Sequence, residues 1–478
     1  MVRQDIVRGG ILIGPVAIFL AVYSIHWPAD VPLISPDSPS YLAFEPIRSG
    51  GYPFFLAALK LILRDTANFV VAQYVFYGLA VLVFARELAR AERSLLFCLI
   101  VEVGLLANWE VNRYHFSIIS ESPFLSVSVL FLAAALAYLR AGSGRSLATA
   151  CGLAGVAFTI RPTGVVFIAA LPFLAAAGPG SLSLVGRSLR VILPVVIILA
   201  AESLYYHAHH PGPRQSLLST QLLGKAGMID VADPDRLIDA APPDSKALQR
   251  ALAFQLAPVR QLMVNAPSLA ARCRLEAWYE IFVEHDFARA ARAQASAAGD
   301  KNLVGAELAR IRKGLPDYLR LTADHLFCLW TVWATDKNES RALAAYIAAH
   351  KPLPFGSDVL PHLEKSRVPP FPIFVRTAML ATAASLALAG VLLFRGLVCG
   401  RALSLELRLS GLCGMITHAG LVVTALLSMG LPRYTIGLWP PMVVGLLFFA
   451  ALVGRRLMLL VGPIHRRKLD LPDPADAA

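Results

Sequence analysis

The chain has 478 residues, of which 56% carry hydrophobic side chains and 16% are charged, and its formal net charge is +12. An ordinary soluble domain carries roughly 25% charged residues, so this composition excludes a soluble fold and favours helices that face lipid. The basic residues lie in short clusters between apolar runs. This placement is typical of loops that anchor membrane spans and argues against a nucleic-acid-binding surface.

Apolar runs that suit a membrane span recur from one end of the chain to the other. A span takes about 20 apolar residues. The candidate runs are 9–27, 68–89, 94–108, 121–139, 188–206, 373–394, 410–429 and 435–454. The run 146–177 is too long for one straight helix and contains Arg161-Pro162-Thr163-Gly164, so we expect two short helices that meet at that turn. The sequence therefore predicts an all-α, polytopic transmembrane bundle of about ten spans.

The orientation follows from Lys and Arg, because basic loops resist translocation. With a cytoplasmic N-terminus, the cytoplasmic loops hold Arg3, Arg8, Arg86, Arg90, Arg93, Arg140, Arg145, Arg187, Arg190, Arg395, Arg401, Arg408, Arg455, Arg456, Arg466, Arg467 and Lys468. The opposite short loops hold Arg48, Lys60, Arg64, Arg113, Arg161 and Arg433. We therefore expect both termini in the cytoplasm of a multi-pass cell-membrane protein, the inner membrane in a Gram-negative host.

Three parts are predicted along the chain. Residues 1–206 form an N-terminal membrane module with the first outer loop, residues 207–370 an extracytoplasmic insert, and residues 371–478 a C-terminal membrane module with a basic tail. The insert regains Asp, Pro and Lys and has apolar residues at helical spacing, so we expect it to be mostly helical. Its segment 326–333 is apolar enough to lie along the membrane surface or to be buried inside the insert. No internal repeat is found, which counts against the major transporter folds.

The first outer loop contains a candidate general base. Ser38 followed by Pro39 predicts a helix start with Ser38 as the N-cap, which leaves the Asp37 carboxylate unused by capping. A carboxylate at the mouth of a membrane cavity can accept a proton from a substrate hydroxyl. The alternative is an aspartate in a solvated loop.

Five short motifs follow one another on the predicted outer face. They are Asp37-x-x-x-Tyr41 after the first span, Arg48 with Gly51-Tyr52-Pro53, Glu121-Ser122-Pro123-Phe124 at the start of the fourth span, the Arg161-Pro162 turn, and Arg433-Tyr434 before the last span. In this order they resemble the GT-C superfamily of membrane glycosyltransferases, which includes the bacterial relatives of protein O-mannosyltransferases and the lipid A aminoarabinose transferases. The resemblance covers the membrane portion, whereas the insert matches no family.

The resemblance implies an inverting transfer of a hexose or pentose from a polyprenyl-phosphate donor to a glycan, lipid or protein acceptor, outside the cytoplasm. The roles assigned are Asp37 as general base and Glu121 as second catalytic carboxylate, Arg48, Arg161 and Arg433 as ligands of the donor phosphate, and Tyr41, Tyr52 and Tyr434 as substrate contacts. Many family members have an acidic residue where this chain has Ser38, and Asp where it has Glu121. No cofactor is certain, no metal ligand is assigned, and a divalent metal stays possible.

The three arginines are also candidates on physical grounds. Expulsion of a polyprenyl phosphate leaves an anion that needs cationic stabilisation, and arginine near membrane depth is costly unless it pairs or faces a cavity. The alternative is interfacial snorkelling or a structural ion pair with Glu121 or Asp37. Glu202, inside the seventh span, also needs a partner or a wet cavity unless it reaches water at the span's end.

Other functions stay open at this point. A transporter or flippase for a lipid-linked glycan would use the same cations without bond cleavage, and we expect repeated halves and ionisable residues in the middle of its spans. A non-catalytic assembly protein would bind a partner through the insert. The histidines of His207-x-His209-His210 are either metal ligands or polar interfacial residues. Of six cysteines, Cys273 and Cys328 are the pair that an oxidising compartment could join.

Overall fold

The computed structural model describes residues 2–26, 37–91, 93–179, 183–212, 300–331, 370–399, 403–428 and 432–468, together with isolated positions between 214 and 272. Every regular element in these ranges is helical, as the composition predicted. Within these described ranges, six helices are long and apolar enough to cross a membrane. The other predicted spans correspond to shorter apolar helices, so the structure supports a membrane protein with a smaller set of full-length candidate spans than the sequence indicated.

The helices in chain order are α1 (Val2–His26), α2 (Ser38–Leu42), α3 (Gly51–Ile62), α4 (Ala67–Arg90), α5 (Leu95–Leu106), α6 (Trp109–His115), α7 (Glu121–Ala141), α8 (Gly144–Ile160), η1 (Pro162–Gly164), α9 (Val165–Ala169), α10 (Leu171–Ala177), α11 (Leu184–His209), α17 (Asp300–Lys313), α18 (Leu315–Thr331), α21 (Pro370–Cys399), α22 (Leu405–Leu427), α23 (Pro432–Gly437) and α24 (Trp439–Lys468).

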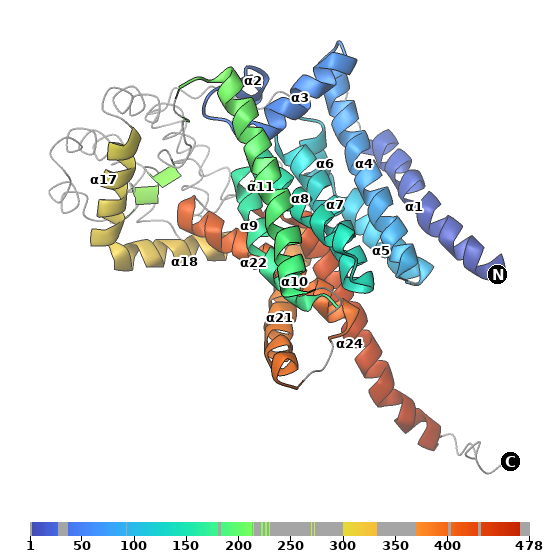
Figure 1. The fold of residues 1–478 in the computed structure, drawn as a ribbon. Coiled ribbons are helices and arrows are strands. Elements are labelled where there is room, and N and C mark those ends of the chain that lie inside the picture. The colour runs from blue at the N-terminus through green and yellow to red at the C-terminus, as the bar shows by residue number, and fades with distance from the viewer. Residues whose placement is uncertain are drawn as a thin grey trace, which may run out of the picture.

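The long N-terminal helices stand side by side in a row (Figure 1). Helix α1 packs on α4 and α5, α4 on α7, α7 on α8, and α8 on α11. In the candidate span of α7, 89% of the residues are buried inside the molecule, whereas none of the α11 span is. Helix α7 is therefore the central element, and α11 leaves an apolar surface for lipid. Helices α21, α22 and α24 pack on one another, and α22 and α24 also cover α7.

The segment after α7 forms the predicted pair of short helices. Helix α8 ends at Ile160, and the chain folds back through η1 into α9 and α10. A Cβ atom at Gly164 would lie 2.4 Å from the carbonyl carbon of Ala157, so only glycine allows this close return. At the far end, the Tyr138 hydroxyl of α7 donates to the Ala175 carbonyl at 3.4 Å. The segment thus returns to the side of the bundle from which it started.

Ion pairs join several helices at that same end of the bundle. The Glu406 carboxylate of α22 pairs with Arg93 at 2.7 Å and with Arg455 of α24. Glu87 of α4 pairs with Arg140 of α7 at 3.4 Å. The basic residues assigned to the cytoplasmic loops therefore also hold helix ends together.

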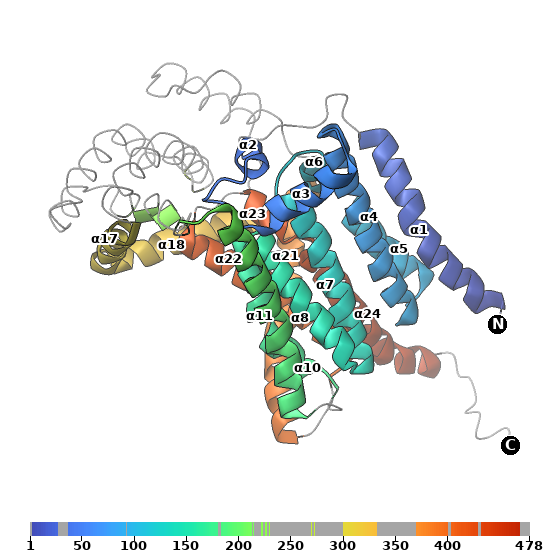
Figure 2. The same ribbon diagram turned by 45° about the horizontal axis from the view of Figure 1, so that its top comes forward.

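The opposite end of the bundle carries the first interhelical loop, in which α2 and α3 lie (Figure 2). The prediction of Ser38 as the N-cap was wrong by one residue, because Ser38 is the first helical residue and Asp37 takes the cap position. The Asp37 side chain makes no capping hydrogen bond, so its carboxylate points elsewhere, as expected. Helix α3 packs closely on α8, because a Cβ atom at Gly51 would lie 2.5 Å from the carbonyl carbon of Thr159.

Part of the insert packs directly on the membrane helices. Helix α18 contacts α21, α22 and α23, and its residue Leu329 belongs to the main hydrophobic core. The apolar segment predicted at 326–333 is therefore buried against the bundle at Cys328 and Leu329, and residues 332–333 lie outside the described residues. Cys328 is disulfide-bonded, and Cys273 lies outside the described residues.

Candidate functional site

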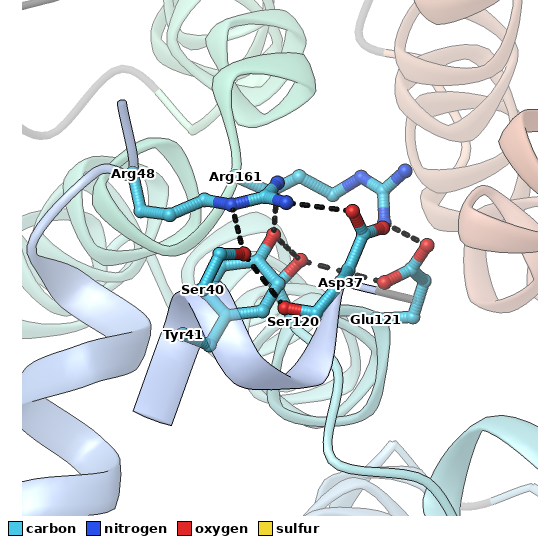
Figure 3. Close-up of polar contacts among 7 residues, drawn as sticks. All are labelled: Asp37, Ser40, Tyr41, Arg48, Ser120, Glu121 and Arg161. Atoms are coloured by element: carbon cyan, nitrogen blue, oxygen red, sulfur yellow. Dashed lines mark hydrogen bonds and ion pairs between the residues drawn. The ribbon is translucent and has the colours of Figure 1, made fainter. Parts of the chain in front are cut away.

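Asp37 and Arg48 form an ion pair at the loop end of the bundle (Figure 3). The Arg48 Nη2 atom lies 2.6 Å from Asp37 Oδ1, and Arg48 Nε donates to Ser40 Oγ at 2.8 Å. The guanidinium also lies 4.4 Å from the centre of the Tyr41 ring. One turn of α2 thus presents a carboxylate, a hydroxyl and an aromatic face to a single arginine, which fixes the guanidinium plane.

A second ion pair joins Glu121 and Arg161, whose Oε1 and Nη1 atoms are 2.5 Å apart. Glu121 is the first residue of α7, where the helix dipole favours a negative charge. Arg161 follows the last residue of α8 and has an extended backbone that projects its side chain from the helix break. The Glu121 and Arg161 side chains are 6% and 11% exposed, against 31% for Asp37 and 14% for Arg48. The second pair is therefore the more deeply buried one.

Tyr41 and Ser120 connect the two pairs. The Tyr41 hydroxyl and Ser120 Oγ are 2.9 Å apart, and Ser120 Oγ donates to Glu121 Oε2 at 3.4 Å. Burial raises the pKa of the Tyr41 phenol, so this group stays a neutral hydrogen-bonding link. The connected side chains in Figure 3 are Asp37, Ser40, Tyr41, Arg48, Ser120, Glu121 and Arg161.

Tyr52 supports this network by packing against Tyr41. Its side chain is fully buried, and its hydroxyl donates to Gln73 Oε1 at 2.6 Å. The Tyr52 ring meets the Tyr41 ring edge to face at 4.9 Å between centroids. Tyr52 therefore fixes the position of Tyr41, and its own hydroxyl is already engaged by α4.

Tyr434 lies on the other side of the second pair. Its ring centre is 5.7 Å from the Arg161 guanidinium, and its hydroxyl accepts from Ser428 Oγ at 3.2 Å. Ser120 before α7, Arg161 after α8 and Tyr434 before α24 thus all lie beside the Glu121–Arg161 pair. The backbone of Arg433 belongs to α23, but its side chain lies outside the described residues.

Two basic residues of the insert extend the polar contacts beyond Ser428. Lys225 Nζ lies 2.5 Å from His325 Nδ1 and donates to the Ala425 carbonyl at 2.6 Å. The His325 ring also lies 3.2 Å from the Ser428 carbonyl. Both basic side chains are fully buried at the C-terminal end of α22, where the helix dipole favours a cation.

The Glu202 side chain holds the first loop against α11. Its Oε1 atom accepts from the Gly50 backbone N–H at 2.7 Å, and Arg214 donates to both carboxylate oxygens, at 2.6 and 3.0 Å. The Tyr206 hydroxyl donates to the Pro46 carbonyl at 2.6 Å. The carboxyl group that the sequence placed inside a span therefore has two protein partners.

Aromatic packing at Phe44 adds to these contacts between the first loop and α11. Among the described residues, Phe44 alone combines a side chain larger than hydrogen with a positive φ, of 48°. Its ring lies 5.3 Å from Tyr205, 5.4 Å from His209 and 4.7 Å from His210 between centroids. Of the three histidines predicted as either metal ligands or polar residues, His209 and His210 thus pack on the loop and hold an uncommon backbone conformation in place.

The candidate carboxylates do not fit a divalent metal centre. Asp37 and Glu121 each face a guanidinium group, and its positive charge would repel a metal cation bound to the same carboxylate. Within the described ranges, no three His, Cys, Asp or Glu side chains lie close enough to hold a metal.

Several residues of the site carry no signal in the sequence. Ser40 and Ser120 lie next to predicted residues, but no motif includes them: Ser40 accepts from Arg48, and Ser120 bonds the Tyr41 hydroxyl. Gln73, Lys225 and His325 belong to no motif, and only the tertiary structure brings them to the site.

The arrangement is suited to an anionic ligand that exchanges partners with the carboxylates. A phosphate that bound the Arg48 guanidinium would release the Asp37 carboxylate, which is the better exposed of the two. The cluster thus pairs carboxylates, which can accept protons, with guanidinium groups, which can bind anions.

Comparison of the chain with protein-family models, curated proteins and solved structures gives no match.

Proposed function

We propose that this chain is an integral-membrane glycosyltransferase of the GT-C type that takes sugar from a polyprenyl-phosphate donor. The observation that supports the proposal best is the pairing of two carboxylates with two arginines, Asp37 with Arg48 and Glu121 with Arg161, in one connected cluster at the loop end of the bundle. Sugar transfer from a lipid phosphate needs a base for the acceptor and a cation for the leaving group.

The proposed reaction is a direct displacement. An acceptor hydroxyl oxygen attacks the anomeric carbon as the bond between that carbon and the phosphate oxygen breaks, so the configuration inverts. The bond electrons leave with the polyprenyl phosphate, which Arg48, Arg161 and Arg433 stabilise. Asp37 takes the hydroxyl proton. Glu121 keeps Arg161 in place, and Tyr41, Tyr52 and Tyr434 shape the site around the substrates.

The proposal includes an orientation. The bundle crosses the bilayer about ten times, with the shorter helices α1, α5, α8 and the α9–α10 arm counted as crossings and both termini in the cytoplasm. The site then faces the periplasm or the exterior, as does the insert. The disulfide at Cys328 supports this side, because disulfides persist in oxidising compartments.

The test is transfer from a labelled polyprenyl-phosphate hexose or pentose by purified protein in detergent, with wild type beside Asp37→Asn. Loss of a general base lowers turnover by about 10² to 10⁴-fold, so we expect that decrease with binding of the donor lipid retained. Asp65→Asn is the matched control, because Asp65 is an exposed residue of the same loop and asparagine can still accept from Ala67 N–H. Wild-type turnover in Asp37→Asn would refute the assignment of the base.

The arginines are tested in the same assay. Alanine at Arg48 or Arg433 should abolish transfer while the protein stays folded and monodisperse. Alanine at Arg161 should abolish transfer and also lower the Tm, because it removes the ion-pair partner of the buried Glu121. Full activity of all three variants would refute their role at the donor phosphate.

One observation favours the transporter alternative. Glu102 lies in α5 and is 1% exposed, and neither of its carboxylate oxygens has a hydrogen-bond partner among the described residues. It lies against Gly14 of α1, and an ionisable residue inside a span is what a coupled transporter needs. Lipid binding without turnover in wild type, together with ion-gradient-dependent movement of a lipid-linked glycan that Glu102→Gln abolishes, would establish transport instead.

A further inference from the structure

Helix α18 has a buried face and an exposed face. Its buried face contains Tyr318, Leu321, His325 and Leu329. Tyr318 and His325 contact the end of α22, and Leu329 belongs to the main hydrophobic core. The exposed face is apolar as well. A helix with apolar residues on both faces needs an apolar environment on each side of it.

The exposed face is a continuous stripe. Leu315, Leu319, Ala323 and Phe327 follow one another at a spacing of four residues, so they lie above one another on the helix surface. Leu315 is 47% exposed, Leu319 54% and Phe327 53%, and Ala323 is also exposed. Single exposed leucines are ordinary on protein surfaces, but a row of this length on one helix indicates a surface that another apolar phase covers.

The position of α18 indicates that this apolar phase is the lipid bilayer. The Tyr318 hydroxyl donates to the Leu426 carbonyl at 2.8 Å, and the His325 ring lies 3.2 Å from the Ser428 carbonyl. Leu426 and Ser428 mark the end of α22, a candidate membrane span. Helix α18 therefore lies level with the end of a span, where the hydrocarbon core gives way to the headgroups.

The direction of α18 is consistent with this depth. In Figures 1 and 2 the helix extends sideways from the bundle, across the direction of α11. Helix α18 also packs on α21, which exposes Ile373 and Leu380 at 65% and 63%. The stripe thus belongs to an element that is continuous with the lipid-facing surface of the spans.

Charged residues at the corner between α17 and α18 add a second argument. The exposed charged residues of the described stretch 312–327 are Arg312, Lys313 and Arg320, all of them basic. Cations beside an apolar stripe fit an interface that has acyl chains below and anionic headgroups above.

We propose that α18 is an interfacial membrane helix. Its stripe of Leu315, Leu319, Ala323 and Phe327 lies among the acyl chains of the leaflet at the Asp37 end of the bundle, and the exposed arginines at the corner contact anionic phospholipid headgroups. Helix α18 is thereby held at the end of the bundle that carries the candidate site. This inference does not depend on the proposed sugar transfer.

The test uses a spin label on a single introduced cysteine in the full chain in lipid nanodiscs. The label is placed at Leu319→Cys or Ala323→Cys, and Gly305→Cys in α17 is the matched control. Gly305 is exposed, and a Cβ atom there meets no atom within 4 Å. Wild-type protein treated in parallel gives the background from native cysteines, and only variants with wild-type elution and melting are analysed.

Membrane contact predicts that oxygen relaxes the labels at 319 and 323 more than a water-soluble nickel complex does, and that the order reverses at 305. Phosphatidylglycerol in the nanodisc should increase the depth of the labels at 319 and 323 in the bilayer. The double substitution Arg312→Gln with Arg320→Gln should reduce that increase. Strong nickel accessibility at 319 and 323 would overturn the proposal by placing the stripe in water. Protection from both reagents would overturn it as well, by showing that protein covers the stripe.

Discussion

Asp37 and Glu121 each face an arginine, yet their surroundings give the two carboxylates different physical roles. The Asp37–Arg48 pair is within reach of water, whereas the Glu121–Arg161 pair is almost fully enclosed. An ion pair near the surface contributes little to stability and exchanges partners readily, while removal of one member of a buried pair leaves an uncompensated charge. The accessible pair is therefore suited to chemistry and the enclosed pair to holding helices α7 and α8 together.

This difference predicts that two similar substitutions lower the stability of the protein by different amounts. Glu121→Ala should destabilise the protein by about 3 to 5 kcal/mol, because Arg161 loses this carboxylate in a buried setting. Asp37→Ala should cost less than about 1 kcal/mol and act mainly on turnover. Thermal unfolding in detergent measures both effects, and equal falls in Tm would contradict the assignment. The double substitution Glu121→Ala with Arg161→Met should recover part of the loss, because no buried charge is then left behind.

At the scale of elements, the first loop is positioned by close contacts from three directions. Helix α3 touches the backbone of α8 at Gly51, Glu202 of α11 holds Gly50, and the aromatic cluster of α11 surrounds Phe44. These contacts fix both ends of the segment from Phe44 to Gly51, which carries Arg48, the ion-pair partner of Asp37. Small displacements of α3 are therefore expected to reach the candidate site.

Gly51→Ala tests this coupling. The new Cβ atom would lie 2.5 Å from the Thr159 carbonyl carbon, so α3 must move away from α8. We expect destabilisation of about 1 to 3 kcal/mol and a lower rate of sugar transfer. Gly390→Ala in α21 is the matched control, because a Cβ atom there meets nothing within 4 Å, and alanine in an open helical position is neutral or stabilising. The coupling is refuted if both variants melt and react like wild type.

At the scale of the whole molecule, the sequence was most informative where the bilayer sets the pattern. Hydropathy located the long helices because lipid tolerates only apolar, internally hydrogen-bonded segments. The sequence Arg161-Pro162-Thr163-Gly164 located the turn between α8 and α9, because proline and glycine limit the backbone there. The order of the motifs also placed Asp37 and Glu121 at the same end of the bundle.

The remaining features depend on contacts between distant residues. Lys225 and His325 are 100 positions apart, and no local pattern indicates that they meet at the end of α22. The capping prediction at Ser38 failed because serine and aspartate both suit an N-cap, and the sequence does not show which of them the chain uses. Amphipathic spacing predicted a mostly helical insert, but spacing does not specify the surface on which a helix such as α18 packs.

The insert also makes the stability of the whole molecule depend on pH. Glu307 of α17 is fully buried, neither of its oxygens has a hydrogen-bond partner in the described part of the chain, and burial raises its pKa from 4.5 to about 7 against the opposing effect of Arg310. A raised carboxyl pKa means that the folded state prefers the protonated form. The stabilisation is complete below about pH 4.5 and is lost as the pH rises through about 7.

Glu307→Gln is expected to raise the Tm at about pH 8 and to leave it nearly unchanged at about pH 5. The gain at the higher pH is on the order of 3 kcal/mol. Thermal unfolding in detergent at both pH values measures it, with Asp317→Asn of α18 as the conservative control. A gain of the same size at both pH values would show that side-chain shape, and not the proton, is responsible.

The hairpin of α8 with α9 and α10 has a consequence for biosynthesis. Helix α8 has 17 residues, and the returning arm is divided into helices of five and seven residues, so neither arm is a strong signal for membrane insertion by itself. We expect both arms to leave the translocon together, after Arg187 and Arg190 have emerged from the ribosome and fixed the return to the cytoplasm. Nascent chains that end at the Arg161 turn should then not yet be integrated into the bilayer. Chains that extend into α11 should be fully integrated.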